Sequence, residues 1–253
     1  MTTRVRDAGE FCWLNMLTSR PADARAFYAA VLGWTYIEMP GMGHRIQAGG
    51  RDIGAIFDLD GPDTPPGASA ELGVMVKVTD ADATVARVLS FGGSARPAWD
   101  IGPAGRMSVC GDPMGAKFDL WQPKQMMGFD ADASTPGAPS WFELRTVDAH
   151  RAGAFYGGVF GWEVRETPGE GTPYATFLRD GVPVAGMRVI GAEGGAPHWL
   201  TYFAVPDADH AVQVALNGGA TVVMTVIDMP GVGQIAGLVS PQGVEFNVFA
   251  AAG

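Results

Sequence analysis

Short stretches in which apolar and polar residues alternate surround a segment with the spacing of an amphipathic helix. Residues 11–17 alternate as a half-buried strand does, and residues 21–32 carry apolar side chains at helical spacing up to Gly33-Trp34. Three short strands are predicted to follow, over residues 34–39, 44–48 and 53–59. The pattern therefore predicts a strand, a helix and three strands, the order βαβββ.

The same order begins again after a segment rich in Pro and Gly at residues 61–67. A strand is predicted over residues 72–78, and Asp80 is predicted to cap a helix that reaches Phe91 and is closed by Gly92-Gly93. Further strands are predicted near residues 95–99, 107–110 and 116–121. The first half of the chain thus contains two βαβββ modules.

Much of this pattern repeats 128 residues further along the chain. Trp13, Ala26-Phe27-Tyr28 and Gly33-Trp34 recur as Trp141, Ala154-Phe155-Tyr156 and Gly161-Trp162. We therefore predict an α+β protein with four βαβββ modules, paired into domains at residues 1–127 and 140–253. Residues 128–139, rich in Ala, Asp, Pro and Gly, are predicted to be an exposed linker.

Strand alternation sorts the side chains of the first and last strand of each copy onto two faces. Leu14 and Met16 lie on one face of the first strand, whereas Trp13 and Asn15 lie on the other. The faces that mix polar and aromatic groups are either exposed to water or line a cavity for an amphipathic molecule. Their tryptophans, together with Trp99, favour the cavity, because large aromatic rings are costly to expose. The mixed faces carry Trp13, Asn15, Lys117, Asp119, Trp121, Trp141, Glu143, Arg145, Glu245, Asn247 and Phe249.

Several of these polar residues could bind a ligand or act in chemistry. Glu143 and Arg145 could orient a polar ligand, with Arg145 gripping a carboxylate or phosphate, or they could form a salt bridge. Asp119 is predicted to lie in an apolar pocket that raises its proton affinity, or to pair with Lys117 or Asn15. His198, beside Trp199, is either a general base or a histidine at the rim.

Composition limits the partners that the protein can have. The formal net charge of −10, without a cluster of Lys or Arg, argues against nucleic acid and anionic membranes. No apolar run approaches the length of a membrane span and residues 1–10 are polar, so a cytoplasmic protein is expected. Cys12 and Cys110 are expected to be buried, reduced thiols. A small-molecule ligand is the expected partner. The protein is expected to be a monomer or a homodimer, and a dimer is not needed to complete a cavity, because each copy already holds two modules.

Several segments resemble the vicinal oxygen chelate superfamily, which contains glyoxalases, bleomycin-resistance proteins and extradiol dioxygenases. They are WFELRTVDAHRAGAFYGGVFGW (141–162) with its counterpart at 13–34, the turns DIGPAGR and DMPGVGQ, DPMGAKFDLWQP (112–123) and SPQGVEFNVF (240–249). The resemblance is greatest to the tandem two-domain actinobacterial glyoxalase-like subgroup, and it covers nearly the whole chain. It implies that each pair of modules curls its mixed sheet into a cup around a ligand, with the helices outside.

The resemblance also implies where metal ligands would lie. Metal-dependent members place a His or Gln on the first strand of each module and a Glu near the end of its last strand. Here the first-strand positions fall on Trp13 and Trp141, and the last-strand positions on Asp119 and Asn247. The second-module positions fall near Leu72 and Trp199, or on Glu71 and His198 after a shift of one residue. These donors are too few for a divalent ion, so no metal and no other cofactor is predicted.

The sequence therefore predicts a metal-free small-molecule binding protein of the glyoxalase and bleomycin-resistance type, with a partly aromatic ligand in a Trp-lined cup. The alternatives are a cofactor-independent enzyme with Asp119 or His198 as acid or base, and a metal-dependent glyoxalase, lyase or dioxygenase if the ligand register is wrong. Whether the protein is an enzyme stays open. The predicted ligand-binding residues are Trp13, Asn15, Trp99, Asp119, Trp121, Trp141, Glu143, Arg145, Trp199 and Asn247.

Overall fold

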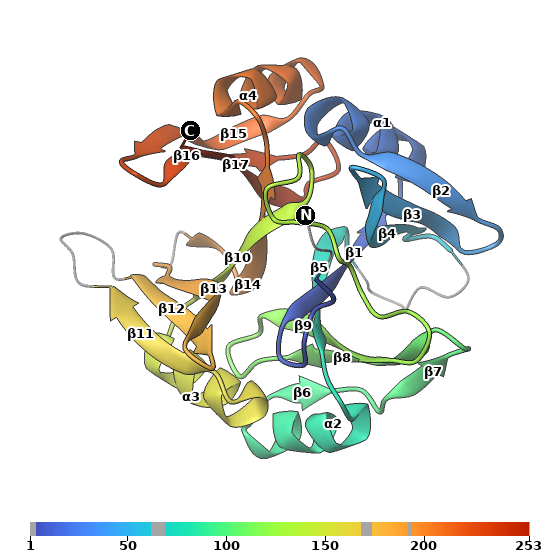
Figure 1. The fold of residues 1–253 in the computed structure, drawn as a ribbon, viewed down its shortest axis with the longest axis vertical. Coiled ribbons are helices and arrows are strands. Elements are labelled where there is room, and N and C mark those ends of the chain that lie inside the picture. The colour runs from blue at the N-terminus through green and yellow to red at the C-terminus, as the bar shows by residue number, and fades with distance from the viewer. Residues whose placement is uncertain (1–3, 62–68, 168–173, 192–193, 253) are drawn as a thin grey trace.

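The computed structural model describes residues 4–61, 69–167, 174–191 and 194–252 (Figure 1). The predicted Pro/Gly-rich segment at 61–67 lies, apart from Gly61, outside the described residues.

The first copy contains the two predicted modules. One consists of β1 (Phe11–Thr18), α1 (Pro21–Leu32), β2 (Thr35–Met39), β3 (Gly43–Ala48) and β4 (Arg51–Asp58). The other consists of β5 (Glu71–Lys77), α2 (Ala81–Ser90), β6 (Ser94–Ala95), β7 (Trp99–Ile101), β8 (Gly105–Gly111) and β9 (Lys117–Pro123). The strand predicted near 95–99 is thus divided into two short strands.

The second copy repeats this order. Its third module consists of β10 (Pro139–Thr146), α3 (Ala149–Phe160), β11 (Glu163–Thr167), β12 (Tyr174–Arg179) and β13 (Val182–Val189). Its fourth consists of β14 (His198–Ala204), α4 (Ala208–Asn217), β15 (Thr221–Met229), β16 (Gly233–Val239) and β17 (Glu245–Ala251). The prediction of an α+β protein with four βαβββ modules is therefore confirmed.

The recurring Gly-Trp pair ends the first helix of each copy. Gly33 and Gly161 have φ angles of 69° and 75°, in the left-handed region that glycine adopts at little cost. The indoles that follow them anchor the other copy. Trp34 Nε1 donates to the carbonyl of Gly137 at 2.7 Å, just before β10, and Trp162 Nε1 donates to the carbonyl of Gly9 at 2.9 Å, just before β1.

Each copy forms one curled mixed sheet. The strand orders are β2-β3-β4-β1-β5-β9-β8-β6, with β7 also paired to β8, and β11-β12-β13-β10-β14-β17-β16-β15. The first strand of each copy lies in the middle, parallel to one neighbour and antiparallel to the other. Residues from β1 and β10 are therefore central to both faces of their sheets.

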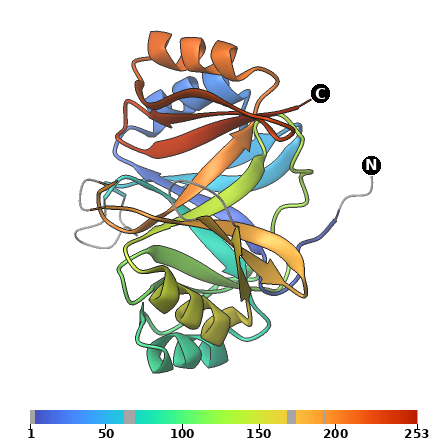
Figure 2. The ribbon, with the colours of Figure 1, turned by 90° about the vertical axis from the view of Figure 1, so that its left-hand side faces the viewer.

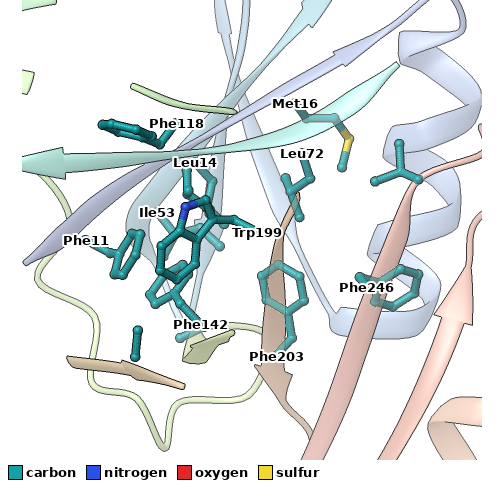
Figure 3. Close-up of a cluster of buried hydrophobic side chains, with 14 of the residues drawn as sticks. Phe11, Leu14, Met16, Ile53, Leu72, Phe118, Phe142, Trp199, Phe203 and Phe246 are labelled. Atoms are coloured by element: carbon teal, nitrogen blue, oxygen red, sulfur yellow. The ribbon is translucent and has the colours of Figure 1, made fainter. Parts of the chain in front are cut away.

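The outer faces of the two sheets meet in a single core. Helices α1 and α4 pack together at one end of the molecule and α2 and α3 at the other, as Figures 1 and 2 show. Between them the rings of Phe11 and Phe142 stack with their centroids 4.2 Å apart, and Trp199 packs edge-on against Phe11 at 5.0 Å (Figure 3). The helices lie outside the curled sheets, as expected, but their apolar faces are buried between the copies.

The first helix of each copy also packs on the other copy's sheet. Phe27 and Tyr28 of α1 contact Phe246 of β17, and Phe155 and Tyr156 of α3 contact Phe118 of β9. The two copies thus share their cores instead of each enclosing its own.

The linker between the copies is less exposed than the sequence predicts. Phe129, Ala131 and Ala138 are buried, and the guanidinium of Arg6 lies 4.9 Å from the centre of the Phe129 ring. The expectation of an exposed linker was wrong for these residues, because the segment runs across the first copy before it enters β10.

None of the described helices combines the length and the apolar character needed to cross a bilayer.

Because Phe11 joins the two sheets, Phe11→Ala is expected to lower the free energy of unfolding by about 3–5 kcal/mol. The loss should appear as a shift of one cooperative transition in urea, since both copies depend on the same core. Met42→Ala, at a side chain that is 62% exposed, is the control and should change stability by less than about 0.5 kcal/mol. Two separate transitions would contradict the shared core.

Candidate functional site

The face of each sheet that points away from the shared core carries the candidate residues. We call these faces the first cup, formed by β1–β9, and the second cup, formed by β10–β17. In the first cup, Trp13, Asn15 and Leu17 of β1 alternate with the core residues Leu14 and Met16. The predicted division of this strand into two faces is therefore confirmed.

The base of the first cup is a small aromatic and sulfur-rich cluster. Trp13 and Trp121 are buried there with Cys12, Ala55 and Met75. The indole of Trp121 donates to the carbonyl of Met126 at 2.8 Å, which fixes the ring. The side chains that pack around this cluster are Met39, Phe57, Ala104, Met107 and Met126.

A carboxylate and an amide meet at the centre of the first cup. Asn15 Nδ2 donates to Asp119 Oδ2 at 2.9 Å, across the intervening strand β5. Gly73 lies opposite Asn15 in β5, and a Cβ there would be 3.9 Å from the Asp119 carboxylate. Gly73 therefore lies directly beneath the contact, at van der Waals distance from it. Both polar side chains are half-buried, so they remain within reach of a ligand.

Burial raises the pKa of Asp119 to about 7. The hydrogen bond from Asn15 opposes this shift, whereas the nearby Glu71 carboxylate adds to it, and Lys117, which pairs with Glu71 at 3.0 Å, weakly opposes it. Asp119 can therefore exchange a proton near neutral pH, which suits both hydrogen bonding to a ligand and acid–base chemistry.

The second cup has a buried charge cluster in place of this pair. Glu143, at the position equivalent to Asn15, is almost fully buried and lies 2.6 Å from Arg145 Nε and 3.7 Å from Arg188 Nε. The hydroxyl of Tyr202 donates to its other oxygen at 3.2 Å. Burial lowers the pKa of Arg145, but Glu143, Tyr202 and Glu245 together raise it by more, so the net pKa is raised. The salt bridge between Glu143 and Arg145, one of the two readings of the sequence, is thus present.

Aromatic side chains line the second cup beside these charges. Trp141 Nε1 donates to the hydroxyl of Tyr174 at 3.0 Å. A Cβ on Gly186 would lie 1.9 Å from that hydroxyl, so only glycine permits this arrangement. Trp141 and Phe249 pack against the buried cluster that contains Tyr202, and Asn247 is buried at the position equivalent to Asp119.

His198 lies on the cup side of β14. Its Nε2 is 3.5 Å from Glu245 Oε2, and its Nδ1 is 2.8 Å from the carbonyl of Ala196. Burial lowers the pKa of His198, but Glu245 and the carbonyl of Ala196 together raise it by more, and the imidazole in turn lowers the pKa of Glu245. The histidine is about one-third exposed and already paired, which agrees with the rim position that the sequence left open.

One predicted ligand-binding residue lies elsewhere. Trp199 faces the shared core, where its indole donates to Tyr156 Oη at 2.9 Å, so it does not join the residues of the second cup. His198 and Trp199 are neighbours on one strand and cannot both face the cup, and the structure turns His198 inward. Trp99 of the edge strand β7 lies directly opposite Met107 and therefore shares its face of the sheet, so the ring belongs to the rim of the first cup, where it is 36% exposed.

Sequence reasoning missed Tyr174, Arg188 and Tyr202. Tyr202 could have been found by alternation from His198, because four residues along a strand return to the same face. Arg188 and Tyr174 face the cup through the pairing of β12 with β13 and of β13 with β10, which a single sequence does not specify.

The residues of neither cup fit a divalent metal ion. In the first cup the groups that meet are one carboxylate and one amide, Asp119 and Asn15. In the second, Glu143 already faces two guanidinium groups, which repel a cation. Within the described parts of the chain, no group of three or more His, Cys, Asp and Glu side chains is placed to hold a metal.

Known proteins support the duplicated architecture. A family model described as a glyoxalase-like domain matches residues 13–121 and again residues 141–249. The chain is 34% identical over 243 residues to a protein of Mycobacterium tuberculosis named "Putative glyoxylase CFP32", covering 93% of this chain and 92% of that protein. It is 31% identical over 256 residues to "Anthracycline biosynthesis protein DauV" of a Streptomyces species, covering 95% and 92%.

Solved structures share the fold at low sequence identity. A Mn(II)-bound glyoxalase from Novosphingobium aromaticivorans superposes with a TM-score of 0.67 at 15% identity, over 96% of this chain and 82% of that one. The 2,3-dioxygenase LapB from Pseudomonas sp. KL28 gives 0.67 at 14% identity, over 99% and 94%. This confirms the predicted likeness in fold to the vicinal oxygen chelate superfamily.

The raised pKa of Asp119 makes stability depend on pH. An unfolded aspartate has a pKa near 3.9, so the folded state holds the proton more tightly and gains stability from it below about pH 4. That gain is lost as pH rises to about 7. Urea unfolding between pH 4 and 8 should therefore show the free energy of unfolding of the wild type falling relative to that of Asp119→Asn. Above about pH 7 the difference between the two proteins should stay constant.

The matched control is Asp209→Asn, at an exposed carboxylate in the first turn of α4. Its stability should follow the wild type across the range. Parallel curves for the wild type and Asp119→Asn would show that Asp119 has an ordinary pKa.

Proposed function

Because this chain belongs to the family of glyoxalase-like domains, we propose that it is a small-molecule binding protein that holds a partly aromatic ligand in its first cup without a metal ion. The observation that carries the proposal is the Asn15–Asp119 pair, which presents polar groups above a base of aromatic and sulfur-containing side chains. Sites for small molecules commonly combine an apolar lining with a few placed polar groups.

The first cup favours a neutral ligand with a hydroxyl or carbonyl group on an aromatic frame. Phe57, Met39 and Met107, which are only partly buried, offer apolar and polarisable surface above the buried Trp13 and Trp121. Above its pKa the Asp119 carboxylate accepts a hydrogen bond from a ligand hydroxyl, while Asn15 supplies an amide that can donate or accept. The name of the relative from anthracycline biosynthesis agrees with a polycyclic aromatic ligand.

2-Naphthol is a neutral probe with both features. At pH 8, where Asp119 is ionised, Asp119→Asn is expected to weaken its binding about tenfold, because a hydrogen bond to a charged acceptor becomes one to a neutral acceptor. At pH 6 the loss should be smaller, since the wild-type carboxyl group is then largely protonated. Isothermal titration calorimetry measures both differences.

Asp209→Asn is again the matched control and should bind 2-naphthol as the wild type does. Overnight treatment with EDTA should leave the affinity unchanged, and elemental analysis should find no stoichiometric Mn, Fe or Zn. A stoichiometric metal whose removal abolishes binding would contradict the metal-free proposal. Equal binding by the wild type and Asp119→Asn at pH 8 would remove the first cup as the site.

A second candidate function follows from the same carboxylate. A general base works best when its pKa is close to the working pH, and the pKa of Asp119 is about 7. Asp119 could take a proton from the carbon beside a ketone, while Asn15 donates a hydrogen bond to the carbonyl oxygen on which negative charge develops. His198 is less suited to this role because Glu245 already pairs with it.

2-Tetralone tests the catalytic alternative, since it is a neutral bicyclic ketone with exchangeable protons beside the carbonyl. An enzyme of this type should speed deuterium exchange at C1 in proportion to ionised Asp119, with the rate rising through about pH 7. Asp119→Asn should lose at least about a hundredfold of that rate enhancement. Proton NMR measures the exchange. If its rate equals the rate in buffer while 2-naphthol binds tightly, the catalytic alternative is excluded and the binding function remains.

A further inference from the structure

The second cup differs from the first in the charge of its central row. Arg145 of β10 lies opposite Arg188 of β13 and His198 of β14, so three basic side chains share one level of the sheet. At the corresponding level of the first cup, Leu17 lies opposite Phe57 and Glu71. A row that is apolar and acidic in one copy is therefore basic in the other, on equivalent strands.

The acidic side chains nearby do not balance this row. Glu143 carries one negative charge that Arg145 and Arg188 share, at 2.6 and 3.7 Å, and Glu245 pairs with His198. When His198 is protonated, one guanidinium charge is left over. The excess lies on Arg188, which is farther from Glu143 and more exposed, at 38% against 19% for Arg145.

Arg188 is also prepared to receive a planar anion. Its guanidinium lies 5.6 Å from the centre of the Tyr174 ring, a contact that holds the group in place. Among the described residues it makes no hydrogen bond, so its fork of donors is free for a carboxylate. Deeper in the cup, Asn247 is 1% exposed and its Nδ2 has no hydrogen-bond acceptor in the same part of the chain, which leaves a buried donor facing the cup.

We propose that the second cup is a separate binding site for an aromatic monocarboxylate, whose anionic end binds Arg188 and whose ring lies against Trp141 and Phe249. One uncompensated guanidinium suits one negative charge, whereas the second charge of a phosphate dianion would have no cationic partner in this row. The inference rests on the proposed function only in that both treat the cups as ligand sites. The two cups then bind ligands of different charge.

The test compares 1-naphthoate with its neutral analogue 1-naphthamide by isothermal titration calorimetry. The wild type should bind the carboxylate at least about tenfold more tightly than the amide, and added salt should weaken only the carboxylate. Arg188→Met keeps much of the length of the side chain without its charge and should lose most of this preference. Arg188→Lys should keep part of it, because the charge remains but the fork of donors does not.

Arg151→Met, at an exposed position on α3, is the matched control and should bind 1-naphthoate as the wild type does. Arg188 is chosen over Arg145 because it is the more exposed partner of Glu143, and thermal unfolding of Arg188→Met should confirm that the variant folds. Equal affinity for the acid and the amide, no binding of 1-naphthoate at about 1 mM, or full binding by Arg188→Met would each overturn the inference.

The same variants separate this inference from the proposed function. If 1-naphthoate binding is lost in Asp119→Asn and kept in Arg188→Met, the anion binds in the first cup and the inference is wrong while the proposed function stands. If 2-naphthol fails to bind but 1-naphthoate depends on Arg188, the inference stands and the proposal for the first cup fails.

Discussion

Every feature of the two sites depends on the alternation of side chains along the central strands. In β1 and β10 one set of residues joins the core shared by the copies, and the other set faces the cup. A shift of one residue would exchange Trp13 and Asn15 with Leu14 and Met16. The stacking of Phe11 on Phe142 opposes such a shift, because it fixes the strands of both copies against each other.

Much of the fold could be predicted from the sequence because the relevant signals are local. The order βαβββ, the helix-ending glycines Gly33 and Gly161, and the division of β1 into two faces depend on periodicity and on single residues. The repeat then carried these features to the second copy. The burial of the linker at Phe129 had no local signal, since it depends on where the chain must cross to reach β10.

The candidate site was predicted only in part, for reasons of long-range pairing. Asn15, Asp119, Glu143 and Arg145 were placed correctly on cup faces because their strands alternate clearly. Trp199 was grouped with the cup because of its residue type, although the alternation that includes His198 turns it toward the core. Residues contributed by β12 and β13 needed a register that only the assembled sheet defines.

The exchange of aromatic side chains between the copies affects how the protein can evolve. Because Phe27 and Tyr28 pack on Phe246, and Phe155 on Phe118, a change on one side of the shared core needs a matching change in the other copy. Within the described parts of the chain, the cup residues Asn15, Asp119, Glu143 and Arg188 have their side-chain partners in their own copy. After the duplication, mutations could therefore accumulate in each concave surface separately, while the matched hydrophobic positions stayed alike enough to preserve the repeat.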